Sequence, residues 1–394
     1  MPLLPVKSGI DLFGEKWPRS LRKARVGLLV HPASVNRNLE HTACLIHKSK
    51  QFELKALFGP QHGIRGETQD NMVEWEGFHD RKTDLPVFSL YGRNRKPDTF
   101  MLKNLDGMLI DLQDIGSRYY TFIWTMDLCM QACTEMNKSV VVLDRPNPIG
   151  GHLTEGPVLN KTFASFVGRH PIPVRHGMTI GEIGNYLHGE YYPSLDFYVI
   201  SMQGWERRMW FDQTGCPWVM PSPNMPTQDT AMVYPGMCLL EGTNISEGRG
   251  TTRPFELFGA PFIDPDLLVG RLKKHQISGV IFRPVYFQPT FQKYAGRLCG
   301  GAQIHVTDRE KFRPLKTGAA VIKAIHDLYP DQFAWEQPPY EYEYEKMPVD
   351  ILAGTDRLRR DIENSVSLDR MEAWWQKECI QFNKNMRKKY LLYD

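Results

Sequence analysis

The first half of the chain alternates short apolar runs with longer segments whose apolar residues recur at helical spacing. The apolar runs are nearly continuous, which is typical of parallel strands covered on both faces. They lie at residues 25–31, 54–58, 86–90, 107–112 and 140–144, and helical segments lie at 39–49 and 121–137. Thr179 and Glu182 form a capping-box pattern that predicts a further helix start. This order predicts an open parallel α/β sheet.

The second half of the chain has a mixed pattern. It predicts strands at 279–286 and 303–306, and helices at 315–328, 356–365 and 369–390. The run of alternating tyrosine and glutamate at 340–345 is typical of an exposed strand or a loop. A proline-rich segment at 217–226 is too rigid for a helix and marks a junction. We therefore predict an N-terminal domain at 1–228 and a smaller mixed α+β domain at 229–394.

Polar residues follow several predicted strands at the point where each strand ends. Ligands of open α/β sheets bind beyond the carboxyl ends of the strands. We expect one rim of the sheet to gather Gln61, His62, Asp114, Arg118, Tyr119, Asp144, Arg145 and Asn147.

The segment at 241–256 combines three carboxylates and two arginines with three glycines, so a regular helix or strand is not expected there. A loop rich in ionisable groups beside an apolar run is typical of a binding loop on a rigid element. The alternative is a solvated turn, but such a turn has no need of arginines placed among glutamates. We predict that this loop opens the second domain and faces the rim of the first.

The composition excludes several classes of protein. With 42% hydrophobic and 24% charged residues the chain is typical of a soluble globular protein, and a net charge of +3 gives no support for a nucleic-acid partner. No stretch reaches the roughly 20 apolar residues of a membrane span. The N-terminal residues lack signal-peptide features, which predicts a cytoplasmic protein, or a periplasmic or secreted one if the start was trimmed.

Motifs for common cofactors are missing from the sequence. There is no G-x-G-x-x-G, no phosphate loop, no G-x-S-x-G, no H-E-x-x-H and no paired C-x-x-C. We therefore expect neither a cofactor nor a metal. Carboxylates, arginines, amides and aromatic rings remain, and this is a set that carbohydrate sites use. Glycoside hydrolysis commonly needs two carboxyl groups, so it is one of several options at this point.

Several long motifs resemble one known family. They are LFGPQHGIRG, DLQDIGSRYYTFIWTM, LDRPNPIGG, EGPVL, PVRHGMTIGE, PSPNMPT, VYPGMCLLEGTNISEGRGTTRPFE and HVTDR. In this order they resemble the NamZ family of exo-β-N-acetylmuramidases over roughly residues 9–380. The resemblance implies a Rossmann-like N-terminal domain, an active site between the two domains, and release of N-acetylmuramic acid from the non-reducing end of peptidoglycan fragments. It implies no metal or nucleotide.

Two carboxylates are our catalytic candidates, Glu247 in the glycine-rich loop and Asp114 at the rim. The alternatives are that Glu247 only pairs with an arginine, and that Asp114 only caps the following helix. The family commonly has glutamate at the position of Gln61. If that glutamate is the general acid, this chain has either lost the role or moved it to another residue.

The remaining candidates are substrate-binding residues. Arg145, Arg175 and Arg249 are candidates for the lactyl carboxylate of muramic acid, because a guanidinium binds a carboxylate in bidentate fashion. The other candidates are Gln61, His62, Arg118, Tyr119, Asn147 and Asn224. Two other functions stay open from the sequence, a non-catalytic protein that binds muropeptide sugars and an enzyme that acts on nucleotide sugars. The sequence does not define the oligomeric state.

Overall fold

A seven-stranded sheet forms the centre of the first half of the chain. The computed structural model describes residues 5–70 and 72–394, and the strand order is β3-β4-β2-β1-β5-β6-β9. All neighbours are parallel except the edge pair of β3 and β4. The strands are β1 (Arg25–Val30), β2 (Glu53–Gly59), β3 (Phe78–Asp80), β4 (Leu85–Ser89), β5 (Gly107–Asp111), β6 (Ser139–Leu143) and β9 (Phe197–Ile200). The predicted parallel α/β sheet is confirmed.

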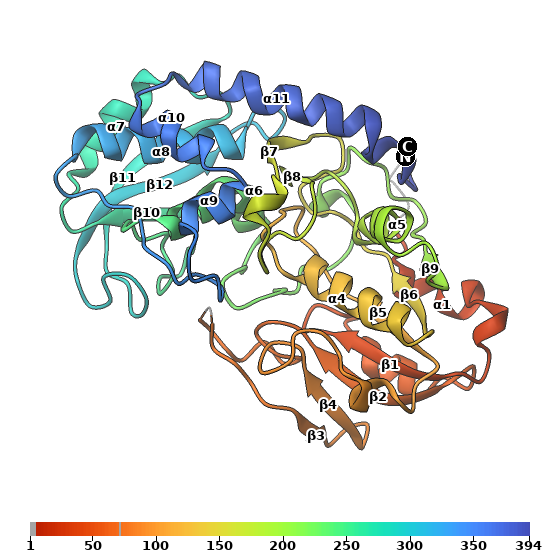
Figure 1. The fold of residues 1–394 in the computed structure, drawn as a ribbon. Coiled ribbons are helices and arrows are strands. Elements are labelled where there is room, and N and C mark those ends of the chain that lie inside the picture. The colour runs from red at the N-terminus through yellow and green to blue at the C-terminus, as the bar shows by residue number, and fades with distance from the viewer. Residues whose placement is uncertain (1–4, 71) are drawn as a thin grey trace.

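Helices cover both faces of this sheet (Figure 1). Leu28 packs in one apolar cluster with residues of α1 (Gly9–Lys16) and α2 (Thr42–His47). Its neighbour Leu29 packs in a second cluster on the opposite face. That cluster includes residues of α3 (Thr99–Leu102), α4 (Phe122–Glu135) and α5 (Ile180–Tyr191). Burial on both faces explains why the strands read as continuous apolar runs.

The second half contains a three-stranded antiparallel sheet in the order β10-β12-β11. Its strands are β10 (Leu257–Ala260), β11 (Val280–Phe287) and β12 (Cys299–Val306). The sequence predicted only 303–306 for the last of these, because Gly300 and Gly301 obscure the start of the strand. A Cβ on Gly301 would lie 1.9 Å from the carbonyl oxygen of Phe258, so this close pairing requires glycine.

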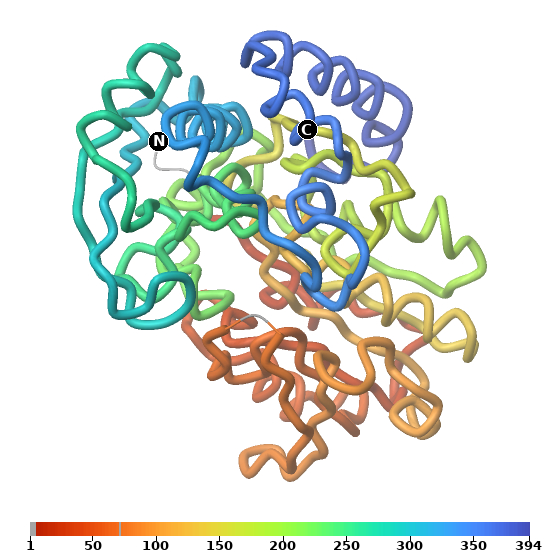
Figure 2. The backbone as a smooth tube through the Cα atoms, turned by 60° about the vertical axis from the view of Figure 1, so that its left-hand side comes forward, coloured from red at the N-terminus to blue at the C-terminus, as the bar shows by residue number. Residues whose placement is uncertain are grey.

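Helices surround this smaller sheet and join it to the first half. They are α6 (Gln228–Met237), α7 (Pro265–Lys274), α8 (Pro314–Leu328), α9 (Pro348–Ala353), α10 (Arg357–Glu363) and α11 (Leu368–Asn385). The long helix α11 runs over the short pair β7 (Glu155–Val158) and β8 (Pro173–Arg175) (Figures 1 and 2). One apolar cluster contains residues from both halves, such as Trp124 and Trp375, so the halves share a core. Within the described residues, no helix is long and apolar enough to cross a bilayer.

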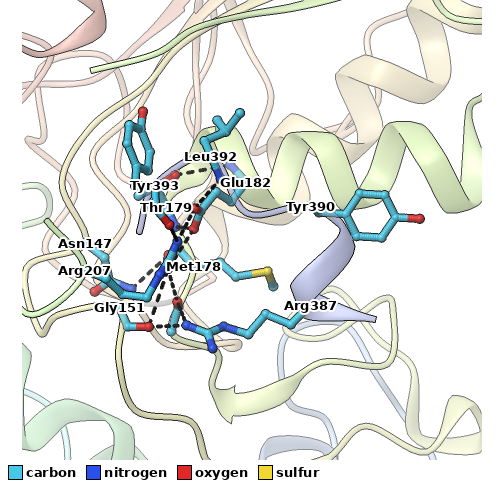
Figure 3. Close-up of polar contacts among 12 residues, drawn as sticks. Asn147, Gly151, Met178, Thr179, Glu182, Arg207, Arg387, Tyr390, Leu392 and Tyr393 are labelled. Carbon is cyan, nitrogen blue, oxygen red and sulfur yellow. Dashed lines mark hydrogen bonds and ion pairs between the residues drawn. The ribbon is translucent and has the colours of Figure 1, made fainter. Parts of the chain in front are cut away.

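The last residues of the chain, 387–394, return to the first half and form what we call the C-terminal clasp (Figure 3). Glu182 accepts hydrogen bonds from Arg207 Nη2 at 2.6 Å and from the backbone N–H of Leu392 at 2.8 Å. The hydroxyl of Tyr393 donates to Asp144 Oδ2 at 2.5 Å. Burial raises the pKa of Asp144 to about 7, although the Tyr393 hydrogen bond opposes this. The clasp therefore supplies a hydrogen-bond donor to Asp144, a buried carboxyl group directly after β6.

We predict that Tyr393→Phe lowers the free energy of unfolding by about 1–3 kcal/mol, because a buried carboxyl loses a donor. Urea denaturation followed by circular dichroism measures the change. Tyr344→Phe is the matched control, since Tyr344 is 69% exposed and the same atom is removed. Equal stability of the Tyr393→Phe variant and the wild type would contradict the role of the clasp.

Candidate active site

A cavity lies where the loops after the parallel strands meet the loops of the second half. The space between its lining residues is about 450 Å³ when open solvent is counted. Gln61 and His62 line it from the loop after β2, and Tyr119 lines it from the loop after β5. From the second half it is lined by Glu241, Arg249, Phe255, Tyr340 and Glu341. The 241–256 loop and the strand ends of the first half thus face a shared cavity.

Two glycines give the 241–256 loop its shape. Gly248 and Gly250 have φ values of +81° and +78°, a region that favours glycine. A Cβ on Gly248 would also lie 2.4 Å from the carbonyl oxygen of Leu257. The resulting turn brings Arg249 into the cavity between two glutamates of the same loop.

Arg249 is the centre of a buried ion cluster. Its Nη2 donates to Glu241 Oε1 at 2.7 Å, and its Nε lies 3.3 Å from Glu247 Oε1. Lys293 Nζ lies 3.2 Å from Glu247 Oε2. Burial alone would raise the pKa of Glu241, but Arg249, a hydrogen bond from Tyr340 and the charge of Lys293 hold it below its usual value. Glu241 is therefore ionised at neutral pH.

Glu341 has the opposite protonation behaviour on the wall of the same cavity. Its Oε2 accepts a hydrogen bond from Tyr91 Oη at 2.7 Å, and its Oε1 accepts one from Gln61 Nε2 at 3.2 Å. Burial raises the pKa of Glu341 to about 7, and the negative charge of Glu241 contributes to the rise. The cavity thus holds an ionised glutamate and a glutamate that keeps its proton near neutral pH.

Glu341 was not among the predicted site residues, because the alternating run at 340–345 resembles an exposed segment. Glu341 and Tyr342 have φ values of +45° and +67°, so the loop turns back on itself and places Glu341 inside. Glu341 is only 4% exposed, whereas Tyr344 in the same run is 69% exposed. We find no signal in the sequence that separates Glu341 from its neighbours.

His62 is neutral at neutral pH. Burial lowers its pKa to about 4, and the charge of Arg249 adds to the effect. Its Nδ1 lies 2.7 Å from the carbonyl oxygen of Thr68, so Nδ1 carries the proton and donates there. In this tautomer Nε2 is an acceptor.

The structure brings five of the predicted substrate-binding residues together around the cavity: Gln61, His62, Tyr119, Asn224 and Arg249. The predicted catalytic Glu247 lies directly behind Arg249 and lines an adjacent cavity with Lys293. The contact between Glu247 and an arginine corresponds to the alternative role considered from the sequence. The catalytic role of Glu247 stays a prediction.

Asp114 and Arg118 lie outside the lining of this cavity. Asp114 Oδ2 accepts from the backbone N–H of Gly116 at 2.7 Å and lies 3.2 Å from His176 Nε2. Asp114 thus holds the turn after β5. Arg118 is fully buried and donates to three backbone carbonyls, those of Pro157, Ile172 and Leu352. Because Leu352 belongs to α9, Arg118 joins the two halves of the chain.

Three further predicted residues, Arg145, Asn147 and Arg175, also lie outside the cavity lining. Their side chains form hydrogen bonds with backbone carbonyls or with an acidic side chain. Arg145 Nη2 donates to Asp111 Oδ2 at 2.7 Å, which links β5 to the loop after β6. The amide of Asn147 donates to the carbonyl of Met178 at 2.9 Å, and Arg175 donates to a backbone carbonyl. Of the three arginines considered for the lactyl carboxylate, Arg249 is the one that lines the cavity.

The fold and the cavity define a two-part α/β protein whose site has the carboxyl, guanidinium and tyrosine groups that glycosidases use. Family models agree with this class. The N-terminal model of the exo-β-N-acetylmuramidase NamZ matches residues 26–229, and its C-terminal model matches residues 232–393. The chain therefore belongs to the NamZ family, and the resemblance seen in the sequence is confirmed.

Individual relatives extend this result. The peptidoglycan β-N-acetylmuramidase NamZ of Bacillus subtilis (strain 168) is 46% identical over 388 residues, which are 98% of this chain and 91% of the relative. Crystal structures of two DUF1343 family proteins from Bacteroides fragilis NCTC 9343 share the fold. One has a TM-score of 0.88 and 34% identity over the whole of both chains. The other has a TM-score of 0.76 and 30% identity over 99% of each chain.

We predict that Arg249→Met destabilises the protein by about 3–5 kcal/mol, because buried carboxylates lose their cation. Without Arg249 the folded-state pKa of Glu241 rises above its unfolded value, so the folded variant binds more protons. The deficit in stability should then shrink as the pH falls from about 8 to about 5. Urea denaturation at both pH values measures the deficit.

The matched control for this experiment is Arg253→Met on the same loop. Arg253 pairs with Glu256, and its side chain is 47% exposed, so its removal should change stability little. Equal losses for the two variants would contradict the importance of the buried cluster.

Proposed function

We propose that this protein is an exo-acting glycoside hydrolase that releases N-acetylmuramic acid from the non-reducing end of peptidoglycan fragments. The B. subtilis relative is named a peptidoglycan β-N-acetylmuramidase and is similar over nearly the whole chain, and the two family models are those of an exo-β-N-acetylmuramidase. One structural observation supports the proposal above the others. Glu241 and Glu341 line one cavity, and their environments move their pKa values in opposite directions. Such a pair is what acid and base roles require.

Arg249 is the group that we propose for recognition of the lactyl carboxylate. Of the arginines considered for this role, it is the one that lines the cavity. A guanidinium can bind a carboxylate in a fixed orientation. In this scheme Glu247 and Lys293 set the position of Arg249, and Glu247 acts through it.

The other groups of the cavity suit the rest of the sugar. The neutral His62 offers an acceptor for a hydroxyl, and Asn224 and Tyr119 line the same space. Glu241 is ionised, so it can stabilise the positive charge that develops at the anomeric carbon or activate a water molecule. We propose that residues 1–228 and 229–394 are the two domains, because the cavity lies between loops of these two parts.

The test is an assay with the disaccharide MurNAc-β-1,4-GlcNAc, followed by mass spectrometry of the products. We predict free MurNAc and GlcNAc, and no cleavage of GlcNAc-β-1,4-GlcNAc, because the second substrate has no lactyl carboxylate for Arg249. Longer MurNAc-terminated chains should lose one MurNAc first, as expected for an exo-acting enzyme.

Two results would contradict this proposal. Binding of the disaccharide by calorimetry without turnover would favour a sugar-binding protein. Equal cleavage of both disaccharides would contradict the proposal that Arg249 selects substrates with muramic acid.

A further inference from the structure

Glu341 is a buried carboxyl group that no known motif of the sequence assigns to a role. We propose that Glu341 is the catalytic residue that donates a proton to the glycosidic oxygen. This inference rests on the proposed glycosidase function and names the residue that begins the reaction. It stands on the position of Glu341 in the cavity and on the groups that hold its carboxyl.

The loop that carries Glu341 has a fixed shape. Tyr340 and Glu343 exchange two backbone hydrogen bonds of 2.9 Å each, which closes a tight turn around Glu341 and Tyr342. The turn places Glu341 on the cavity wall, while Glu345 in the same loop is exposed. Tyr340 belongs to the same turn, and its hydroxyl donates to Glu241 Oε2 at 2.5 Å. One short loop therefore carries one cavity glutamate and contacts the other.

Residues of the first half orient the carboxyl of Glu341. Tyr91 Oη donates to it at 2.7 Å, and Gln61 Nε2 donates at 3.2 Å. Gln61 is itself held by Thr121, whose hydroxyl donates to Gln61 Oε1 at 2.7 Å. The amide of Gln61 does not titrate at neutral pH, so it can orient a proton donor but cannot be one. Glu341, which accepts the hydrogen bond from Gln61, can donate a proton.

The surroundings of Glu341 let it keep its proton to a higher pH than an ordinary glutamate does. Burial and the negative charge of Glu241 raise its pKa, while the Tyr91 and Gln61 hydrogen bonds and the charge of Arg95 oppose the rise, leaving the pKa at about 7. The other charged group on the wall, Arg249, is already paired with Glu241 and Glu247. A general acid works best when its pKa lies near the operating pH.

The step is a hydrolysis and needs no other reactant than water. The proton of Glu341 moves to the glycosidic oxygen as the bond between this oxygen and the anomeric carbon breaks. Water adds to the anomeric carbon and gives a proton to the ionised carboxylate of Glu241. Glu241 then releases this proton to solvent, and Glu341 takes up one proton from solvent, so both groups return to their starting states. The products are free N-acetylmuramic acid and the shortened saccharide.

The test compares two substrates with the variant Glu341→Gln. A sugar leaving group needs protonation, whereas 4-nitrophenolate leaves without it. We expect kcat on MurNAc-β-1,4-GlcNAc to fall by about 10²–10⁴-fold, and kcat on 4-nitrophenyl-β-MurNAc to fall less than about 10-fold. Glu345→Gln is the matched control, because it makes the same change at an exposed position of the same loop, and both activities should stay at the wild-type level.

Different results separate the failure of this inference from the failure of the proposed function. A wild-type protein that cleaves neither substrate contradicts the function itself. A wild-type protein that cleaves both, with a Glu341→Gln variant that loses both equally or loses neither, overturns only the role of Glu341. Thermal unfolding and binding of free MurNAc show whether each variant is folded.

A second variant tests the inference if Glu341→Gln does not fold. Tyr91→Phe removes a hydrogen bond that lowers the pKa of Glu341, so the proton is held to higher pH. For cleavage of the disaccharide, the fall of kcat/KM on the basic side, expected near pH 7 in the wild type, should move to higher pH. A basic limb at the same pH in both proteins would overturn the assignment.

Discussion

The contact between Arg249 and the glutamates of its own loop is the interaction on which the site depends. Together with Lys293, Arg249 balances the charges of two buried carboxylates, and each of these would be costly to bury alone. It also joins two residues of the loop at 241–256, which lines the cavity opposite the strand ends of the first half. Because Arg249 favours the charged form of Glu241, it decides which carboxyl of the cavity is ionised. Shape and charge of the site therefore have a common origin.

The second glutamate of the cavity follows from the first. An ionised Glu241 disfavours a second negative charge nearby, and burial adds to this, so Glu341 keeps its proton to a higher pH. The two residues are about 100 positions apart in the sequence. They are linked in the structure because Tyr340, which directly precedes Glu341, donates a hydrogen bond to Glu241. The cavity is thus assembled from both halves of the chain, which are held together by a shared core, by Arg118 and by the C-terminal clasp.

Much of the fold could be predicted from local patterns in the sequence. The strand runs, the capping box of Thr179 and Glu182, and the helix over 315–328 are found within a few residues of the predicted positions, because they depend on near neighbours. The strand β12 was shortened in the prediction because its glycines have no β propensity of their own. They are explained by the close approach of Phe258, which is distant in the sequence.

The site was less predictable than the fold. Position at a strand end identified Gln61 and His62, and the glycine pattern identified Arg249. Position at a strand end also selected Arg145, and the need for a guanidinium to bind the lactyl carboxylate selected Arg175. The partners of these two arginines are acids and carbonyls that the sequence does not place. Glu341 was missed because its burial comes from a reversal of the backbone and from contacts with Tyr91, 250 positions away. Such contacts exist only in the folded chain.

The protonation states of the two cavity glutamates are the centre of this account, and carbon NMR of protein with labelled glutamate carboxyl groups measures them directly. A carboxyl resonance that titrates near pH 7 should be missing in Glu341→Gln, whereas that of Glu155, whose pKa burial also raises to about 7, should remain. The resonance assigned to Glu241 through Glu241→Gln should stay at the ionised position down to a pH below the ordinary glutamate pKa. If both glutamates titrate together at the ordinary value, the division into a protonated and an ionised group is wrong.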